Sequence, residues 1–250
     1  DFITKSGGVC VEDFNNDGLL DIVASGWFLD EQVKIMFNNG DGTFRDQTEA
    51  ATIKGITGGL DLKAADYNND GFMDILIPRG AWWNDFGKLP ASLLRNNGDG
   101  TFTDVTYETG LFKHLRPTQS AVFADFNNDG WLDIYFGNES RKESEPYYNE
   151  LFLSDGKGKF NEVGKEAGVD VICFSKGVAS ADYNNDGWMD IVVSSQGTRN
   201  YLFRNDTGKN GGKVKFTDVT KEAGVENPIK SFPVAFLDYD NDGWQDLYIA

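Results

Sequence analysis

Apolar residues occur along this chain in short runs of three to five, separated by turns rich in glycine, asparagine and aspartate. In the first 50 residues such runs lie at 9–11, 22–24 and 33–37, and another starts at Phe44. The runs are rich in valine, isoleucine and phenylalanine and show no helical period, which predicts strands. Asn-Gly and Asp-Gly steps before the fourth run are typical of hairpins. The pattern therefore predicts a four-stranded antiparallel meander.

The pattern repeats along the whole chain. The stretch DFNNDGLLD, which starts at Asp13, recurs with small changes at Asp66, Asp125, Asp182 and Asp238. The spacings of 53, 59, 57 and 56 residues indicate similar units that begin near residues 6, 59, 118, 175 and 231. Four short strands per unit, with small residues in the first, are typical of a β-propeller blade. We predict an all-β fold, a β-propeller of four-stranded blades, with about four and a half blades in residues 1–250.

Charge and composition narrow the classes of partner. The chain has 40 acidic and 23 basic side chains and a formal net charge of −17, so it has no basic face for the phosphates of a nucleic acid. No apolar run approaches the roughly 18 residues of a membrane span. Cys10 and Cys173 fall at unrelated points of their repeats, and we expect two separate thiols and not a disulfide.

The repeated acidic stretch has the oxygen donors that calcium requires. Calcium takes about six to eight oxygens, and each loop has side-chain oxygens at positions one, three, five and nine, a carbonyl at seven and glycine at six for a sharp turn. An EF-hand would need glutamate at position twelve, where this chain has apolar residues. The alternatives are five acidic turns without an ion and a catalytic carboxylate cluster. Ion-free acidic turns are disfavoured because all five loops retain the ninth aspartate. A catalytic cluster is disfavoured because the same residues repeat in every loop, whereas an enzyme needs one differentiated site.

The expected ligands occupy the same five positions in every loop. In order of position they are Asp13, Asn15, Asp17, Leu19 and Asp21; Asp66, Asn68, Asp70, Phe72 and Asp74; Asp125, Asn127, Asp129, Trp131 and Asp133; Asp182, Asn184, Asp186, Trp188 and Asp190; and Asp238, Asp240, Asp242, Trp244 and Asp246. Only the carbonyl is expected to bind at position seven, where the varying apolar side chain indicates packing. Clustered carboxylates repel one another in an empty loop, so we expect up to five Ca²⁺ ions and calcium-dependent stability.

These loops, together with LLRNNGDGTFTDVTYETGL from Leu93 and VKFTDVTKEAGV from Val214, resemble the FG-GAP/VCBS repeat family, which also occurs in integrin alpha subunits. Both of these stretches are similar to the branch that includes cartilage acidic protein and bacterial proteins with a C-terminal ASPIC/UnbV segment. The resemblance implies a propeller, commonly of seven blades, with calcium loops on one face and partners on the other. We therefore expect residues 1–250 to form one propeller domain that is incomplete at its C-terminus.

Two loops on that second face are candidates for binding. The loop of residues 78–88 carries Trp82 and Trp83, which would stack on a sugar or anchor a protein, or else cover the blade edge. The loop of residues 139–148 is charged and ends in Tyr147 and Tyr148, and a solvated excursion is the alternative there. The sequons at Asn138 and Asn205 matter only in a glycosylating host.

The sequence thus predicts a calcium-stabilised module that is extracellular, on the cell surface or periplasmic, and that binds or adheres to a glycan or protein partner without chemistry of its own. One alternative is a polysaccharide-processing, lyase-like enzyme, for which the candidate residues are Arg79, His114, Arg116 and Lys230. Another is an architectural part of a larger surface assembly. Propellers host many unrelated functions, so the fold does not choose among these.

Overall fold

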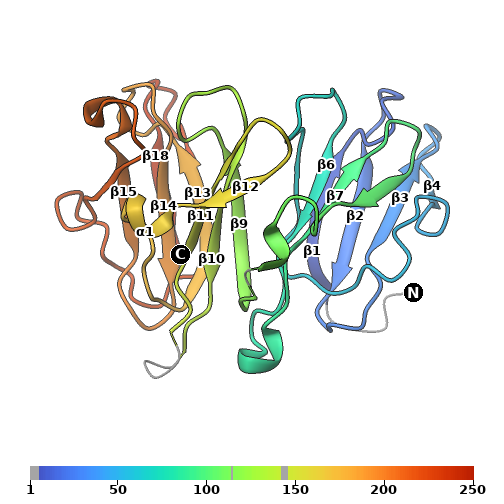
Figure 1. Ribbon diagram of the computed structural model, residues 1–250, viewed down its shortest axis with the longest axis horizontal. Coiled ribbons are helices and arrows are strands. Elements are labelled where there is room, and N and C mark those ends of the chain that lie inside the picture. The colour runs from blue at the N-terminus through green and yellow to red at the C-terminus, as the bar shows by residue number, and fades with distance from the viewer. Residues whose placement is uncertain (1–5, 114, 142–145) are drawn as a thin grey trace. The chain divides into compact units, whose positions relative to one another are not determined.

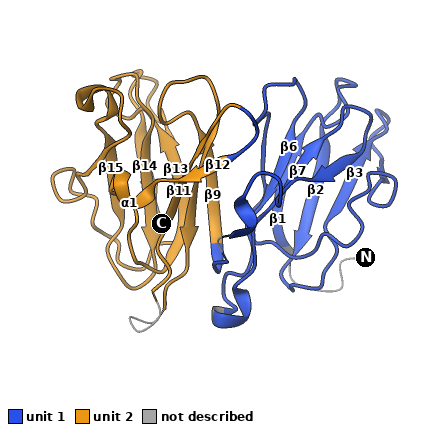
Figure 2. Ribbon diagram, in the orientation of Figure 1, with its two compact units in different colours: residues 1–118, 157–159 blue, residues 119–156, 160–250 orange. Residues whose placement is uncertain are grey.

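The computed structural model describes residues 6–113, 115–141 and 146–250, and its regular structure is dominated by antiparallel strands (Figure 1). The chain forms two compact units (Figure 2). Unit 1 contains residues 1–118 and 157–159, and unit 2 contains residues 119–156 and 160–250. No helix among the described residues is long and apolar enough to cross a membrane.

Unit 1 contains two four-stranded sheets, in which each strand pairs antiparallel with the next one in sequence. The first sheet consists of β1 (Ser6–Glu12), β2 (Asp21–Gly26), β3 (Lys34–Asn38) and β4 (Phe44–Asp46). The second consists of β5 (Lys63–Ala65), β6 (Asp74–Ile77), β7 (Ser92–Asn96) and β8 (Phe102–Asp104). Two short 3₁₀ helices lie outside the sheets: η1 (Asn84–Gly87) and η2 (Leu111–Lys113).

Unit 2 contains two further four-stranded sheets and a pair of strands. The third sheet consists of β9 (Thr118–Ala124), β10 (Asp133–Asn138), β11 (Glu150–Ser154) and β12 (Phe160–Glu162). The fourth consists of β13 (Ser175–Ala181), β14 (Asp190–Ser195), β15 (Tyr201–Asn205) and β16 (Phe216–Asp218). The pair consists of β17 (Val234–Leu237) and β18 (Asp246–Ile249), and the short helices are α1 (Gly164–Ala167) and η3 (Thr207–Asn210).

The strand boundaries confirm the meander expected from the sequence. Each acidic loop joins the first strand of its sheet to the second, and the twelfth position of every loop lies inside that second strand, so none of the loops is an EF-hand.

Cys10, half-buried, and Cys173, buried, are free thiols, as predicted. The all-β fold class of four-stranded propeller blades is confirmed, whereas a single domain over residues 1–250 stays a prediction. The fourth strand of the first sheet starts at Phe44, as predicted, and those of the other sheets start at Phe102, Phe160 and Phe216.

Adjacent sheets within each unit share an apolar core that also anchors the acidic loops. In unit 1, Phe14 from the first acidic loop meets Phe102 of the next sheet edge to face, with ring centres 6.1 Å apart. In unit 2, Phe126 and Phe216 repeat this contact at 5.8 Å. Phe14 and Phe126 are fully buried, and burial of such a ring stabilises the fold by about 1.5–3 kcal/mol. The second position of these loops is therefore a core position.

Candidate functional site

Each acidic loop is a turn whose side-chain oxygens accept its own backbone N–H groups. In loop one, Asp13 Oδ1 and Asn15 Oδ1 both accept from Asp17 N, at 3.1 and 2.9 Å, and Asp13 Oδ2 accepts from Gly18 N at 2.7 Å. Asp17 Oδ1 accepts from Leu19 N at 2.9 Å. Gly18 has φ +85°, a left-handed conformation that glycine adopts without steric cost. The turn thus gathers the oxygens of positions one and three on its concave side.

The same turn forms in the other four loops. The first carboxylate of each accepts the N–H groups of positions five and six at 2.7 to 3.1 Å, in the loops that start at Asp66, Asp125, Asp182 and Asp238. The oxygens of positions three and five also accept from the same backbone atoms as in loop one. The nine-residue sequence therefore dictates the turn locally, independent of the blade.

The ninth aspartate has a role that its position in the motif did not reveal. In loop four, Asp190 Oδ2 accepts from Tyr183 N at 3.2 Å and Asp190 Oδ1 accepts from Asn205 N at 2.7 Å, so this carboxylate ties the loop to the third strand. Loops one to three repeat both bonds. In these four loops the aspartate has no exposed surface. It supports the turn, whether or not it also binds an ion.

Burial changes the electrostatics of this position. Loss of hydration raises the pKa of Asp74, Asp133 and Asp190 to about 7, partly offset by the two N–H donors and increased by the carboxylates of positions five and one. The pKa of Asp21 is raised for the same reasons. A cation in the loop would favour the charged form of these groups. The negative charge of the ninth aspartate in loops one to four is therefore costly in the absence of a cation.

The donor set fits calcium. In the described part of the chain, one cluster of three acidic residues has a ligand atom from each within 4.8 Å of the others, namely Asp238, Asp240 and Asp246 of loop five. Calcium–oxygen distances are about 2.3–2.6 Å, so two ligands across one ion are separated by up to roughly 5 Å. In the other loops asparagine supplies a neutral amide oxygen at position three, which is an equally suitable hard donor.

Two sets of asparagines connect neighbouring blades, and neither set was predicted from the sequence. At position four, Asn128 Nδ2 donates to the carbonyl of Gly187 at 2.9 Å, and Asn16 and Asn185 make the corresponding bonds to Gly71 and Gly243 at 3.3 and 3.4 Å. Each of these three asparagines has a φ of 55° or 56°, which asparagine tolerates better than most residues. Their recurrence at position four was the available signal.

The second set lies at the end of the third strand. Asn96 Nδ2 donates to the carbonyl of Phe14 in the preceding blade at 2.7 Å, and Asn205 Nδ2 donates to that of Phe126 at 2.9 Å. Both asparagines are almost fully buried, so their amides satisfy carbonyls that have no access to water. In the sequence they read only as the start of a glycine-rich turn.

The apolar residue at position seven packs on the turn between the third and fourth strands. A Cβ atom on Gly98 would lie 2.5 Å from the Phe72 ring, and Gly156 and Gly208 have the same relation to Trp131 and Trp188 at 2.8 and 2.6 Å. This confirms the prediction that these side chains pack. Their carbonyls remain the candidate ligands.

The two predicted tryptophans of unit 1 form part of a ring cluster between two loops on the opposite side from the acidic loops. Trp82 stacks on Trp27 with ring centres 6.0 Å apart and an interplanar angle of 29°. Trp83 meets Phe28 at 6.0 Å and 57°. Trp82 and Trp83 are only partly exposed. The packing alternative therefore describes much of the surface of the two tryptophans. Phe28 of the cluster is 38% exposed, and Phe86, in the adjoining η1, is 84% exposed.

The other predicted contacts lie apart from this cluster. Tyr148 of unit 2 is 42% exposed, and the backbone N–H of half-buried Tyr147 donates to Ser140 Oγ at 3.2 Å. The charged stretch 142–145 before them and His114 lie outside the described residues. Arg79, a candidate of the enzyme alternative, donates from Nε to the carbonyl of Thr57 and from Nη1 to Ser92 Oγ, both at 2.7 Å. Its guanidinium thus holds loops together.

The remaining candidates of the enzyme alternative are Arg116 and Lys230. Arg116 Nη1 donates to the carbonyl of the neighbouring Leu115 at 3.2 Å, and the residue pairs with Leu89 in a β-bridge of unit 1. Lys230 is an exposed residue of unit 2 that pairs with Gln196.

Both sequons are buried. Asn138 has no exposed surface, and its Nδ2 donates to the carbonyl of Tyr148 at 2.7 Å and to Glu150 Oε2 at 3.0 Å. Asn205 is the buried linker described above. Neither amide nitrogen is available for glycosylation in the folded chain.

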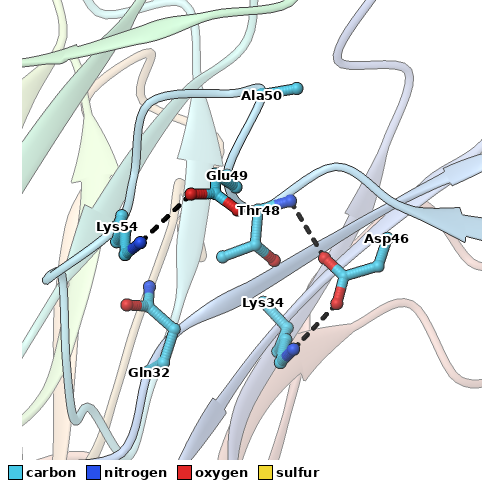
Figure 3. Close-up of a pocket in the computed structure, with 7 residues that line it drawn as sticks. All are labelled: Gln32, Lys34, Asp46, Thr48, Glu49, Ala50 and Lys54. Carbon is cyan, nitrogen blue, oxygen red and sulfur yellow. Dashed lines mark hydrogen bonds and ion pairs between the residues drawn. The ribbon is translucent and has the colours of Figure 1, made fainter.

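One surface groove of about 660 Å³ lies on unit 1, away from the predicted residues (Figure 3). Two ion pairs span it, Lys34 Nζ to Asp46 Oδ2 at 2.7 Å and Lys54 Nζ to Glu49 Oε1 at 3.1 Å. Gln32 Nε2 donates to three backbone carbonyls beneath it. Charges that already neutralise one another in water give little recognition energy.

Comparison with known proteins settles the family. The model of the FG-GAP-like repeat matches residues 13–77, 81–136, 137–193 and 182–249. The chain belongs to the FG-GAP-like repeat family. Cartilage acidic protein 1 of Xenopus tropicalis is 27% identical over 202 residues, which cover 78% of this chain and 29% of that protein. The Homo sapiens protein is 27% identical over 195 residues, which cover 75% of this chain and 28% of that protein.

The resemblance inferred from the repeats is thus confirmed, and this FG-GAP-like chain spans less than a third of the length of these relatives. Among solved structures it is similar to a lectin of Agrocybe aegerita that specifically recognises non-reducing terminal N-acetylglucosamine. The TM-score is 0.53 and the identity 20%, over 98% of this chain and 60% of the lectin chain. At this identity the similarity shows the propeller fold alone.

Proposed function

We propose that this FG-GAP-like chain is a calcium-stabilised, extracytoplasmic binding module that recognises a glycan or protein partner through the face opposite its acidic loops. The observation that carries the calcium part is the fivefold recurrence of one oxygen-lined turn with the same hydrogen bonds. Repetition without differentiation suits a structural ion better than a catalytic centre. The module accordingly has no chemistry of its own.

Calcium would act by neutralising the loops and fixing the contacts between blades. The oxygens of positions one, three, five and nine and the carbonyl of position seven would hold the ion. Extracellular calcium-binding modules bind Ca²⁺ with dissociation constants of about 10⁻⁴ to 10⁻³ M. Such an affinity suits millimolar surroundings, and the formal charge of −17 is tolerable in a chain that takes up several cations. This supports an extracellular, cell-surface or periplasmic location.

Two observations support the binding part. One solved structure with a similar fold is a lectin, and unit 1 exposes aromatic rings on loops that belong to the face opposite the acidic loops. Aromatic side chains on loops of a rigid scaffold are common recognition elements.

Calcium titration of the purified chain tests the proposal. We expect isothermal titration calorimetry to detect binding at millimolar or lower calcium, and we expect the melting temperature to rise between excess chelator and 10 mM calcium. Magnesium at the same concentration is the control, because it prefers a smaller octahedral site and keeps its water ligands. An unchanged melting temperature in chelator, calcium and magnesium alike would sink the calcium part.

A further inference from the structure

Phe86 is the most exposed large apolar side chain in the described part of the chain, at 84%. It lies in η1, and its N–H donates to the carbonyl of Trp83 at 3.1 Å. Side chains three residues apart in a 3₁₀ turn lie on the same side. Phe86 therefore extends the ring cluster of Trp27, Phe28, Trp82 and Trp83 towards solvent. The cluster is separate from the apolar core of unit 1, which contains none of these five residues.

The loop that carries Phe86 is held in one shape. A Cβ atom on Gly80 or on Gly87 would lie 1.9 Å from the carbonyl oxygen of the other, so only two glycines allow the loop to close at its base. Ala81 is 1% exposed and fixes the first arm. Trp82 has φ +71°, a conformation that a bulky residue keeps only where its surroundings enforce it. In Figure 1 this loop is the teal turn at the lower end of unit 1.

An exposed ring is suited to a ligand that offers a flat apolar face. Because the loop backbone closes tightly at Gly80 and Gly87, binding would lose little backbone entropy. The ligand should therefore offer an apolar face to this ring.

The charges of unit 1 restrict the ligand further. Asp30 and Asp85 are exposed on the same two loops as the rings, and the formal charge of the chain is −17. Carboxylates accept hydrogen bonds from hydroxyls but repel sulfates and uronic acids. Lys88 Nζ lies 3.4 Å from Asp85 Oδ1, so these two charges offset each other and the negative charge of Asp30 remains on the other loop. The surroundings favour an uncharged ligand with hydroxyl donors.

We propose that the loop of residues 80–87 is a subsite for a neutral pyranose of a glycan, with Phe86 as the ring on which the sugar stacks. This rests on the proposed binding function and specifies its ligand and its place. A pyranose presents C–H groups on one face and hydroxyls around its edge, which matches an exposed ring with carboxylates beside it. A protein partner would instead require a wider apolar surface around Phe86.

A glycan array with the purified chain in millimolar calcium tests the subsite. The array contains neutral oligosaccharides and sulfated or uronic-acid oligosaccharides, and the dissociation constant of the strongest neutral hit is then measured. Phe86→Leu keeps an apolar side chain but removes the ring, and Phe86→Tyr keeps the ring. Tyr107→Leu is the matched control, because Tyr107 is 72% exposed in the same unit and lies outside the cluster.

We expect Phe86→Leu to weaken binding of the neutral glycan about tenfold or more, as is usual for loss of an aromatic anchor. Phe86→Tyr and Tyr107→Leu should stay within about threefold of the parent chain. Equal binding by Phe86→Leu and the parent would overturn the subsite but leave a glycan-binding function intact. Binding only of anionic glycans, or of no glycan, would overturn the ligand class, whereas the calcium titration tests the module itself independently. Unchanged melting temperatures show that the variants fold.

Discussion

The fourth and fifth acidic loops have nearly the same sequence but different surroundings. In both, the first carboxylate accepts the N–H groups of positions five and six, so the turn itself is the same. Asp190 of loop four is fully buried and its two oxygens accept from Tyr183 N and Asn205 N. Asp246 of loop five is exposed, and its carboxylate accepts from Tyr239 N.

The difference lies in the sheet and not in the loop. Loop four belongs to a four-stranded sheet, whose third strand β15 ends at Asn205 and covers Asp190, whereas the described strands of loop five are β17 and β18. Nine residues are thus enough to make the turn that collects oxygens. Tertiary structure then buries the ninth carboxylate, and burial of its charge is energetically unfavourable.

The largest effect should come from removing the ninth aspartate in the four-stranded sheet of loop four. Asp190→Ala leaves the N–H groups of Tyr183 and Asn205 without their acceptor, which should cost about 2–4 kcal/mol of unfolding free energy. Asp246→Ala exposes its single donor to water and should cost less than about 1 kcal/mol. Urea unfolding of both variants in chelator measures the difference. Equal losses would mean that the third strand does not create the distinction between the two loops.

Calcium should stabilise both loops alike, because the turn that gathers the oxygens is local. Calcium at a hundredfold excess over its dissociation constant adds about 2.7 kcal/mol per site. Asp186→Ala and Asp242→Ala each remove the fifth-position carboxylate of one loop, and each should remove one ion from the calorimetric stoichiometry. A loss confined to one variant would show that ion binding depends on the blade and not on the nine-residue sequence.

Asn205, at the end of the third strand β15, tests how much a buried side-chain amide contributes to the contact between two blades. Asn205 donates to the carbonyls of Phe126 and Met189, whereas Asn38 of the first sheet donates to the exposed carbonyl of Leu20. Asn205→Ala should therefore cost about 1–3 kcal/mol and Asn38→Ala a few tenths. Thermal unfolding in calcium compares the two variants. Similar melting temperatures would argue that the buried amide adds no stability beyond that of an exposed one.

Much of the fold was accessible from the sequence because each blade is specified by short-range signals. Short apolar runs rich in β-forming residues, Asn-Gly turns and the glycine at position six placed the strands and turns correctly. The role of Asp190 and Asn205 was not accessible, because their partners lie on another strand or in another blade. A local motif shows which oxygens a loop has but not which of them the tertiary structure uses.

The opposite face shows the same limit. Trp82 and Trp83 stood out as an adjacent pair, but their ring partners Trp27 and Phe28 lie more than 50 residues away in the sequence. Trp27 and Phe28 directly follow the second strand of the first repeat, and Trp82 and Trp83 lie in the loop after the second strand of the second repeat. This correspondence between repeats was the signal that could have been used. The most exposed ring, Phe86, was unremarkable in sequence because exposure depends on how the loop closes.

The smallest effect concerns position three, where loop five has Asp240 and loop four has Asn184. Three carboxylates lie within 4.8 Å in loop five, so Asp240→Asn should relieve repulsion and raise the stability of the calcium-free chain by about 0.5 kcal/mol. Asn184→Asp should lower it by a similar amount, and calcium should reverse both signs because the ion gains from the added charge. Melting curves in chelator and in calcium test this, at low ionic strength where screening is weak. If the signs are the same with and without calcium, position three does not face the ion, and the ligand set would have to be reassigned to positions one, five, seven and nine.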